Sequence, residues 1–217
     1  MHIGLIGGIG VAATVVYCQR LTAAVAGPFD LTIVHGDIRE LIRNNLADRR
    51  AEQARAFLPL LHRLKAAGCD VAALTSLGAH FCLEELAAIS PLPLVSGVAP
   101  LGDFLADRGI GTVGLLGTRV VMRTRLFGQL RRTRAIALDP EIEALGQKYQ
   151  EVAVAGTCTP EQRAAFLDAG RRMIAAGAEA IVLAGTDLNL AFDGTDPGYP
   201  VIDALDVHVA ALARLAG

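Results

Sequence analysis

Short runs of apolar residues alternate along this chain with longer stretches rich in alanine and leucine. The short runs end in glycine or a polar turn, which is typical of buried strands, and the longer stretches have the length of helices. Strands and helices that alternate in this way form a parallel sheet covered by helices on both faces. In the first half the pattern predicts strands at 3–7, 30–35, 70–75 and 92–96, and helices at 11–25, 48–67 and 80–89.

The second half of the chain repeats the first. Residues 3–8, Ile-Gly-Leu-Ile-Gly-Gly, return 110 residues later at 113–118 as Val-Gly-Leu-Leu-Gly-Thr. The segment 68–74 returns 109 residues later at 177–183. Two matches with nearly the same offset indicate that an α/β unit has been duplicated.

The duplication predicts how the domains are organised. We expect an α/β protein of two pseudo-symmetric Rossmann-like domains, each a parallel sheet of the four-stranded type flanked by helices. Residues 1–97 with 204–217 should form the first domain and 98–203 the second. Ligands of open parallel sheets bind beyond the carboxyl ends of the strands. One cleft between the domains should therefore hold the ligand, lined by the strand ends at 8–10, 35–37, 75–80, 117–119 and 184–187.

Composition excludes several classes of protein. Of the 217 residues, 53% are hydrophobic, which is enough for a large core. The 20 Lys and Arg residues nearly balance the 22 Asp and Glu residues, only 5% of residues are aromatic, and Trp is absent, which argues against nucleic-acid binding. No apolar run reaches the roughly 18 residues of a membrane span, and the first residues lack the features of a signal peptide. We expect a cytoplasmic protein without a nucleic-acid or membrane partner.

The four cysteines form no Cys-x-x-Cys pair, so the sequence predicts neither a zinc ribbon nor a thioredoxin-type site. Cys18, Cys69 and Cys82 are best interpreted as buried structural thiols. Cys158 falls in a predicted loop. No constellation of metal ligands is visible, and we expect no metal.

The run Gly7-Gly8-Ile9-Gly10 opens a predicted helix, where backbone N–H groups can hold a carboxylate or phosphate. It is not the dinucleotide-binding fingerprint, because His35 stands where an acidic residue would end the second strand. A tight strand-to-helix turn that simply needs glycine explains the run equally well.

A set of motifs spread over nearly the whole chain carries a resemblance to a known family. The motifs are Gly4–Gly10 with Ala13-Thr14, Leu74–His80, Gly114–Arg119, Thr159-Pro160-Glu161, Leu183–Asp187, and Pro200–Asp203 followed by His208. On these residues the chain resembles the aspartate/glutamate racemase family, which works without pyridoxal phosphate. The resemblance implies an isomerase that requires no cofactor, acts on a small amino acid or carboxylate, and forms a homodimer.

The chain departs from the family at the residues that carry the chemistry. The family places an acid/base residue, usually cysteine, at the mouth of each half, so that one group removes the α-proton and the other returns a proton to the opposite face. Its motifs read roughly Cys-Asn-Thr-x-His and Gly-Cys-Thr-Glu. Here Ser76 and Gly185 stand at the cysteine positions, Leu77-Gly78 replaces Asn-Thr, and Asp187 follows a retained Thr186. Racemisation by two cysteines is therefore not available to this chain.

The motif matches and the strand ends give the candidate site residues. The candidates for catalysis are Ser76, Thr186, Asp187 and His80. The candidates for substrate binding are Gly8, Ile9, Gly10, His35, Arg43, Leu77, Gly78, Thr118, Arg119, Gly185 and His208.

Several of these residues have a second interpretation. His80 either orients the base or caps a helix, and His35, beside Asp37, is either a cleft residue or a hydrogen-bonded turn histidine. Arg43, in a predicted loop with Asn44-Asn45, either clamps a carboxylate or lies in a plain surface loop. Thr118 and the backbone N–H groups near it, at the start of a predicted helix, could hold an α-carboxylate. The arginine-rich stretch 123–134 is better interpreted as a solvated helix face or subunit contact than as a nucleic-acid patch.

The leading hypothesis is an enzyme that moves an α-proton, with Ser76 acting together with Thr186, Asp187 or a histidine. Because Gly185 supplies no side chain, a one-sided reaction fits better than racemisation. The alternatives are a decarboxylase, isomerase, lyase or cyclase of a specialised pathway, and a catalytically degenerate ligand-binding protein. A further hypothesis is that the missing side chain at Gly185 enlarges the pocket for a larger ligand.

Overall fold

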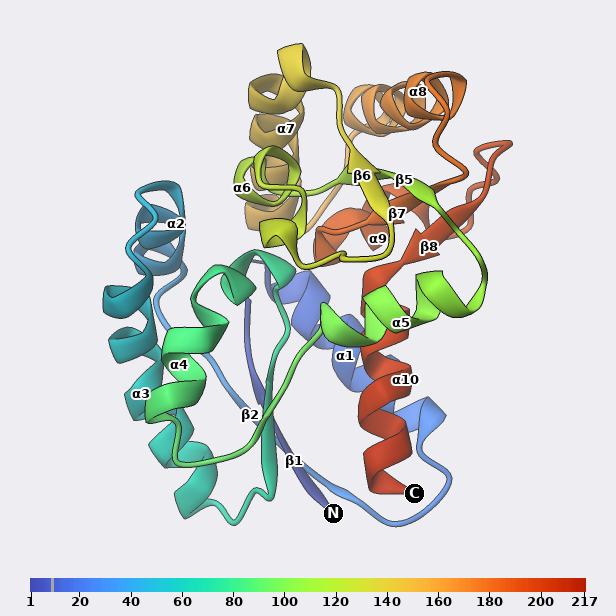
Figure 1. Ribbon diagram of the computed structural model, residues 1–217. Coiled ribbons are helices and arrows are strands. Elements are labelled where there is room, and N and C mark those ends of the chain that lie inside the picture. Colours follow the sequence, from blue (N-terminus) through green and yellow to red (C-terminus); the bar gives the residue numbers. More distant parts are fainter. Residues whose placement is uncertain (9) are drawn as a thin grey trace.

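The computed structural model describes residues 1–8 and 10–217, and its strands form two parallel sheets (Figure 1). The first four strands are β1 (His2–Ile6), β2 (Asp30–Val34), β3 (Val71–Leu74) and β4 (Leu94–Val95). The next four are β5 (Thr112–Leu116), β6 (Arg134–Ile136), β7 (Ala180–Leu183) and β8 (Val201–Asp203). The sheet orders, β2-β1-β3-β4 and β6-β5-β7-β8, are the same arrangement twice. The predicted fold class is confirmed.

Helices flank both sheets. In the first half they are α1 (Val11–Ala24), α2 (Ile38–Leu46), α3 (Arg50–Ala66) and α4 (Leu83–Ile89), with a 3₁₀ turn η1 (Leu77–Cys82). Helix α5 (Ala99–Asp107) leads into the second half, which holds α6 (Arg119–Arg123), α7 (Ile142–Ala155), α8 (Pro160–Ala175) and α9 (Asn189–Phe192). Three further 3₁₀ turns there are η2 (Leu126–Gly128), η3 (Asp139–Glu141) and η4 (Thr186–Leu188), and α10 (Ala204–Ala216) follows β8.

The glycine repeat that revealed the duplication has a packing role in both sheets. A Cβ atom on Gly4 of β1 would lie 2.8 Å from Cδ1 of Leu64 on α3. Its counterpart Gly114 of β5 would place a Cβ atom 2.6 Å from Cδ1 of Ile181 and 3.0 Å from Met173 on α8. Each central strand therefore carries a glycine because a helix packs closely against it.

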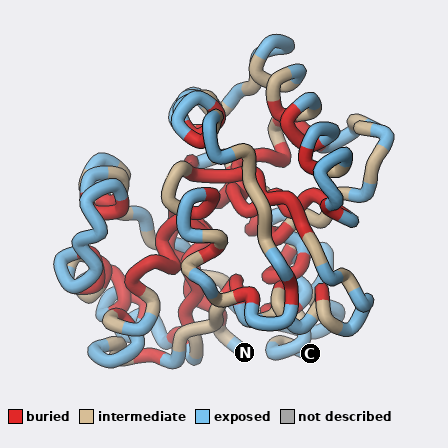
Figure 2. The backbone as a smooth tube through the Cα atoms, turned by 45° about the horizontal axis from the view of Figure 1, so that its top comes forward, coloured by how far each residue is buried: buried red, intermediate tan, exposed pale blue. Residues whose placement is uncertain are grey.

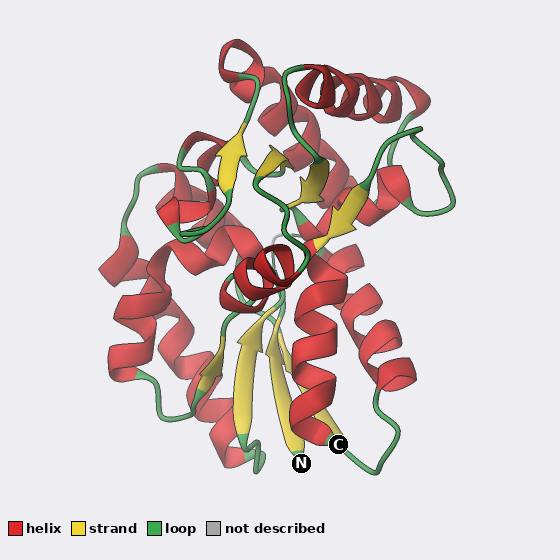
Figure 3. Ribbon diagram, turned by 45° about the vertical axis from the view of Figure 1, so that its right-hand side comes forward, coloured by secondary structure: helices red, strands yellow, loops and turns green. Residues whose placement is uncertain are grey.

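Helix α10 returns the chain from the second sheet to the first. It lies against α1 (Figures 1 and 3). Its buried residues Leu205, Val209 and Leu212 join a hydrophobic cluster that includes Ile3 of β1 and Tyr17 of α1. The core of the first sheet is thus completed by residues that come after the second sheet in the sequence.

A cluster of ion pairs connects α1 to the chain around β8 and α10. Arg20 of α1 contacts Asp203 at the end of β8 (2.9 Å), Asp206 of α10 (2.6 Å) and Asp193 after α9 (2.6 Å). The guanidinium group therefore connects α1 to the returning chain and to a segment of the second half.

Two helix predictions differ from the structure. The segment of Arg43 and Asn44-Asn45 is helix α2 and not a loop: Asp37 caps it by accepting from the N–H of Arg39, and Leu41 lies on its buried face with the two asparagines. Two of its three buried residues are the asparagines Asn44 and Asn45, so the sequence lacks the periodic apolar positions that mark a helix.

The arginine-rich stretch 123–134 is not one helix face. Helix α6 ends at Arg123, and Arg125, Leu126 and Phe127 all have φ between 53° and 59°, which stops any α-helix. Arginines of this segment pair with acids of the second half, such as Arg125 with Asp139 (2.6 Å).

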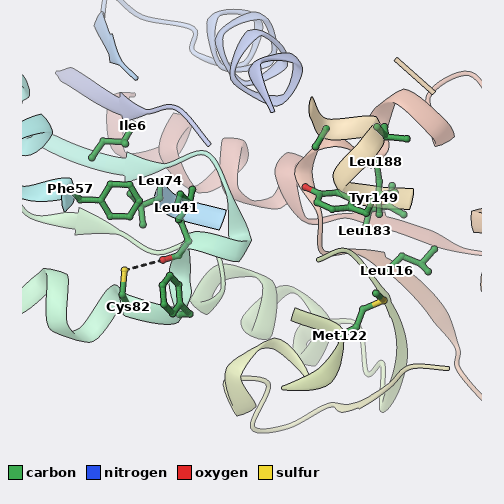
Figure 4. Packing of buried hydrophobic residues seen from close by; sticks show 14 of the residues in the cluster. Ile6, Leu41, Phe57, Leu74, Cys82, Leu116, Met122, Tyr149, Leu183 and Leu188 are labelled. Atoms are coloured by element: carbon green, nitrogen blue, oxygen red, sulfur yellow. Dashed lines mark hydrogen bonds between the residues drawn. The ribbon is translucent and has the colours of Figure 1, made fainter. Parts of the chain in front are cut away.

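Buried residues run through both halves and through the region between them (Figure 2). The largest hydrophobic cluster draws on both domains: Figure 4 shows Leu74 and Phe57 on one side and Leu116 and Tyr149 on the other. The two halves therefore share one continuous apolar interface.

The four cysteines are free thiols. Cys69 and Cys82 are buried, as predicted, and burial raises the pKa of Cys82 to about 12. Cys18 on α1 is only half-buried, which corrects its interpretation as a fully buried thiol, and Cys158 lies in the predicted loop between α7 and α8. No helix in the described part of the chain has both the length and the apolarity to cross a membrane.

Candidate active site

The carboxyl ends of the two sheets meet between the domains. Ser76 lies two residues after the end of β3, and Thr118 lies two residues after the end of β5. A Cβ atom on Gly78 would lie 3.2 Å from Cγ2 and 3.6 Å from Oγ1 of Thr118, and 3.5 Å from Oγ of Ser76. The two hydroxyl groups, one from each domain, therefore flank the same glycine.

Ser76 stands at the mouth of the first half. It is 2% exposed, and Gly8 lies against it: a Cβ atom on Gly8 would come within 2.6 Å of the Ser76 Cβ. Within residues 1–8 and 10–217, neither a histidine ring nor a carboxylate makes a hydrogen bond to the Ser76 hydroxyl. A serine without a bonded base is a weak nucleophile and a weak base.

Two side chains hold the turn that carries Ser76. The Nε2 of His80 accepts from the N–H of Gly97 (2.9 Å), so its Nδ1 carries the proton and donates to the Ser76 carbonyl (3.0 Å). Burial lowers the pKa of His80 to about 4, which keeps the ring neutral. Asn45 of α2 donates from Nδ2 to the carbonyl of Gly78 (2.8 Å). His80 was expected either to orient the base or to cap a helix; its two hydrogen bonds instead connect the Ser76 carbonyl with the N–H of Gly97.

The mouth of the second half is closed by an aromatic ring. A Cβ atom on Gly185 would overlap Cε2 of Tyr149 and lie 2.8 Å from its Cζ. On the other side, the same atom would lie 2.9 Å from the Cα of Gly117. The hypothesis that the missing side chain enlarges the pocket is therefore wrong, because the Tyr149 ring fills that space.

Asp187 crosses from the second half to the first. Its Oδ1 accepts from the N–H of Ala13 in the first turn of α1 (3.1 Å), and its Oδ2 accepts from the hydroxyl of Tyr149 (3.1 Å). Gly10 makes room for the carboxylate, since a Cβ atom there would overlap Oδ1. Burial raises the pKa of Asp187 to about 6, and its two donors act in the opposite direction.

Thr118 and Arg119 begin helix α6. The Thr118 hydroxyl accepts from the N–H of Val121 (3.2 Å) and remains free to donate. Arg119 runs along α7, where it pairs with Glu143 (3.3 Å) and donates to Gln150 (2.9 Å). These contacts occupy most of its donors.

Two adjoining pockets lie between α2 and α7 and together form a groove beside Thr118 and Tyr149. Its outer part, of about 560 Å³, is lined by Arg43 and Ile42 of α2 and by Gln150 of α7. A small pocket of about 20 Å³ behind it shares Ile42 and Gln150 and reaches Thr118 and Tyr149. Arg43 is thus an exposed side chain at the outer groove.

The remaining predicted residues lie in different surroundings. His35 is exposed, and its ring lies against Gly7, where a Cβ atom would overlap the His35 Nδ1. Leu77 is buried in an apolar cluster with Val98 and Leu101, so its side chain is directed into the core and not toward a substrate. Thr186 is buried at the start of η4, and Ile9 lies outside the described residues.

His208 belongs to the return of the chain and not to the strand-end mouths. Its Nδ1 is bonded to the Tyr17 hydroxyl (2.9 Å), and its ring packs edge-on to His80 beside Gly97. Burial lowers its pKa to about 3. The placement gives His208 a structural role, which differs from the predicted contact with substrate.

The described part of the chain, 1–8 and 10–217, brings no three His, Cys, Asp or Glu side chains together as a metal site requires.

The family model of the Asp/Glu/hydantoin racemases matches residues 6–212. The chain belongs to this family. The match covers both strand-end mouths, so the two halves described above are the two halves of a racemase-family fold.

Solved structures agree with this assignment at the level of the fold. A candidate Asp/Glu racemase from Yersinia pestis superposes with a TM-score of 0.81 at 23% identity, covering 99% of this chain and 98% of that one. An aspartate racemase homologue from Pyrococcus horikoshii gives 0.79 at 21% identity, covering 99% and 98%. The aspartate racemase of Picrophilus torridus gives 0.79 at 19% identity, covering 100% and 94%. None of the curated proteins matches the sequence of this racemase-family chain.

Sequence reasoning missed two residues that the geometry brings into the site. Tyr149 carried no signal in the sequence, because it lies outside the family motifs and outside the predicted strand ends. Asn45 was noted only as a neighbour of Arg43, although a buried asparagine beside a strand-end turn is a common support for a backbone carbonyl.

Proposed function

We propose that this racemase-family protein is a cofactor-independent proton-transfer enzyme for a small amino acid or carboxylate, with Asp187 as its acid/base group. The position of the Asp187 carboxyl supports this most directly. It is 1% exposed, comes from the second half, and reaches the first turn of α1 in the first half.

Asp187 suits the chemistry better than Ser76 does. Proton transfer is most efficient when the pKa of the group is close to the working pH. Burial brings the pKa of Asp187 to about 6, so the carboxylate is the main form at neutral pH and accepts a proton readily. The Ser76 hydroxyl has no bonded base to activate it.

Ser76 and Thr118 are then the groups that bind the substrate carboxylate. Their hydroxyls flank Gly78 from the two halves, and within the described residues neither hydroxyl donates a hydrogen bond. His80 and Asn45 contribute by holding the turn of residues 76–78 in place. Thr186, next to Asp187, is a further candidate donor.

The reaction transfers one proton. The Asp187 carboxylate takes the α-proton; the C–H bond breaks, its electron pair stays on the substrate, and an O–H bond forms on Asp187. The negative charge spreads into the substrate carboxylate, where hydrogen bonds from Ser76 and Thr118 stabilise it. The Asp187 acid exchanges its proton with water and then returns a proton to the α-carbon.

Proton NMR in D₂O tests the proposal. The protein is incubated with L- and D-aspartate and L- and D-glutamate, and loss of the α-proton signal is followed. We expect exchange with at least one of these acids, and a loss of at least about 100-fold in Asp187→Asn. Ser76→Ala should lose about 10-fold, the cost of one hydrogen bond to a charged group.

The pH profile and a control variant sharpen this test. Since the base form of Asp187 removes the proton, kcat/KM should rise with pH and level off above about 6. Asp107→Asn, an exposed carboxylate on α5, should leave exchange unchanged. Absence of exchange with all four acids would reject the proposed reaction and favour a ligand-binding protein, and an active Asp187→Asn would reject Asp187 as the base.

We also expect a homodimer, as the resemblance implies, and a cytoplasmic location. Sedimentation equilibrium measures the assembly state directly.

A further inference from the structure

The backbone at position 185 does not require glycine. Its φ of −122° and ψ of 114° are extended values that any residue adopts. The neighbouring atoms are what exclude a side chain, because a Cβ atom would overlap the Tyr149 ring. Gly185 and Tyr149 are therefore complementary in shape: the ring occupies the volume that a side chain at 185 would take.

The Tyr149 ring is fixed in this place. It comes from α7, is 1% exposed, and belongs to the apolar cluster that also contains Leu116, Leu183 and Leu188 (Figure 4). A close-packed ring cannot swing aside without opening a cavity of its own size. The ring is thus a permanent wall of the second mouth.

The hydroxyl of the same residue sets the direction of Asp187. It donates to Oδ2, while the N–H of Ala13 donates to Oδ1. Each carboxylate oxygen therefore has one donor, one from each domain, and keeps a lone pair for a proton. The groups that face Asp187 are neutral: a phenol, whose pKa burial raises well above 10, and a helix N-terminus.

We propose that Tyr149 is a positioning residue that takes the space of the second acid/base side chain and fixes Asp187, so that proton exchange occurs on one face of the substrate only. This inference rests on the proposed function. Asp187, held by Tyr149 of the second half, exchanges the proton, and in the described part of the chain the Ser76 hydroxyl has no bonded base that could exchange one from another side. The α-carbon should consequently exchange its hydrogen with its configuration retained.

Isotope labelling tests the stereochemical part. The enantiomers of the exchanging acid are incubated separately in D₂O, and the deuterated product is resolved by chiral chromatography. We expect at least about 90% of the label in the starting enantiomer, corresponding to a preference of about 10-fold, or 1.4 kcal/mol. Equal label in both enantiomers would overturn exchange on one face.

A packing test needs no substrate. Gly185→Ala should lower Tm by roughly 3–10 °C, because the methyl group meets the ring. The loss should persist in Tyr149→Phe, which keeps the ring, and be smaller in Tyr149→Ala, which removes the ring but leaves the 2.9 Å contact with the Cα of Gly117. An unchanged Tm for Gly185→Ala, or an equal loss in all three backgrounds, would overturn the complementarity of the two residues.

Carbon-13 NMR of the Asp187 side chain tests the hydrogen bond. Removal of the donor in Tyr149→Phe should move the pKa of Asp187 upward by about one pH unit. Gln150→Ala, at a neighbouring position of α7 that does not contact Asp187, is the matched control and should leave the pKa of Asp187 unchanged. An Asp187 that titrates identically in Tyr149→Phe would overturn the positioning role.

The readouts separate the two proposals. In one outcome, the Tyr149 variants change both the cost of Gly185→Ala and the pKa of Asp187, but no acid exchanges its α-proton. This outcome would reject the proposed reaction and retain Tyr149 as the residue that fixes Asp187. Exchange that depends on Asp187 but scrambles the label would retain the proposed reaction and reject the restriction to one face.

Discussion

The two mouths of the cleft are built alike but hold different chemistry. In each half, a side chain of the helix after the second strand binds the residue two positions beyond Ser76 or Gly185. In the first half, Asn45 of α2 binds the carbonyl of Gly78. In the second, Tyr149 of α7 binds the carboxylate of Asp187. The same support therefore fixes a neutral backbone group on one side and an ionisable group on the other.

The two halves thus keep the same backbone arrangement at their strand ends while their side chains differ. Gly8 packs against Ser76 in the first mouth, and Gly117 packs against the backbone of Ala184 and Gly185 in the second. Both mouths keep close contact between neighbouring strand ends, although Ser76 stands in one and Gly185 in the other. Because the scaffold is fixed by backbone packing, the side chains at the mouths are free to diverge.

The largest expected effect comes from breaking the close contact in each mouth. Gly117→Ala would place a methyl group 2.9 Å from backbone atoms of Ala184, and we expect a loss of about 3 kcal/mol in the free energy of unfolding. Gly8→Ala meets a side chain, Ser76, and should lose about 2 kcal/mol. Urea titration measures both. Gly27→Ala, which meets nothing within 4 Å, should stay within about 0.5 kcal/mol of wild type; a comparable loss there would contradict the argument.

The second effect is the change of the free energy of unfolding with pH that comes from Asp187 in the second half. Burial raises the pKa of Asp187 from 3.8 to about 6, so the folded state binds its proton more tightly than the unfolded chain does. Its contribution to stability is fully present below about pH 4 and is lost as pH rises through 6, on the order of 2 kcal/mol. The carboxylate that the proposed reaction needs is thus the form that folding disfavours.

Urea titrations from pH 4 to 7 detect this effect by comparison. In Asp187→Asn the fall in stability over this interval should be smaller than in wild type. It should not vanish, because burial also raises the pKa of Asp203 to about 6 and that carboxyl contributes with the same sign. Parallel curves for the two proteins would show that Asp187 titrates normally in the folded state.

The smallest effect should come from the first half, where Asn45 binds the carbonyl of Gly78. Asn45→Ala leaves the buried carbonyl of Gly78 without its donor, which costs about 1–2 kcal/mol. If the turn of residues 76–78 binds the substrate carboxylate, KM should rise as well. Asn44→Ala, which breaks the neighbouring bond to Gln53, should cost similar stability and leave KM unchanged. An equal change of KM in the two variants would count against a binding role for the first mouth.

Much of this molecule could be predicted from its sequence because the duplication is visible in it. Gly4 and Gly114 recur at matched positions, and both are needed for the same close packing of a helix. Strand ends lie at one edge of a parallel sheet, so Ser76, Thr118 and Asp187 could be expected near one another. These inferences depend on local periodicity and on topology, which the sequence records directly.

The rest depends on tertiary packing, which no local pattern records. Tyr149 reaches Gly185 from a helix that starts over forty residues before it, and only the way α7 lies against η4 brings them together. Leu77 and His208 match family positions, but their side chains are held in the core. A motif identifies a position in the chain and does not fix where its side chain points.

The return of α10 to the first sheet also has a consequence for biosynthesis. Leu205, Val209 and Leu212 complete the apolar cluster around Ile3, yet the ribosome makes them only after the whole second sheet. The amino-terminal domain therefore emerges with an uncovered face and must wait for more than a hundred residues before it can close. The core of the first sheet therefore closes only after the last helix of the chain has been made.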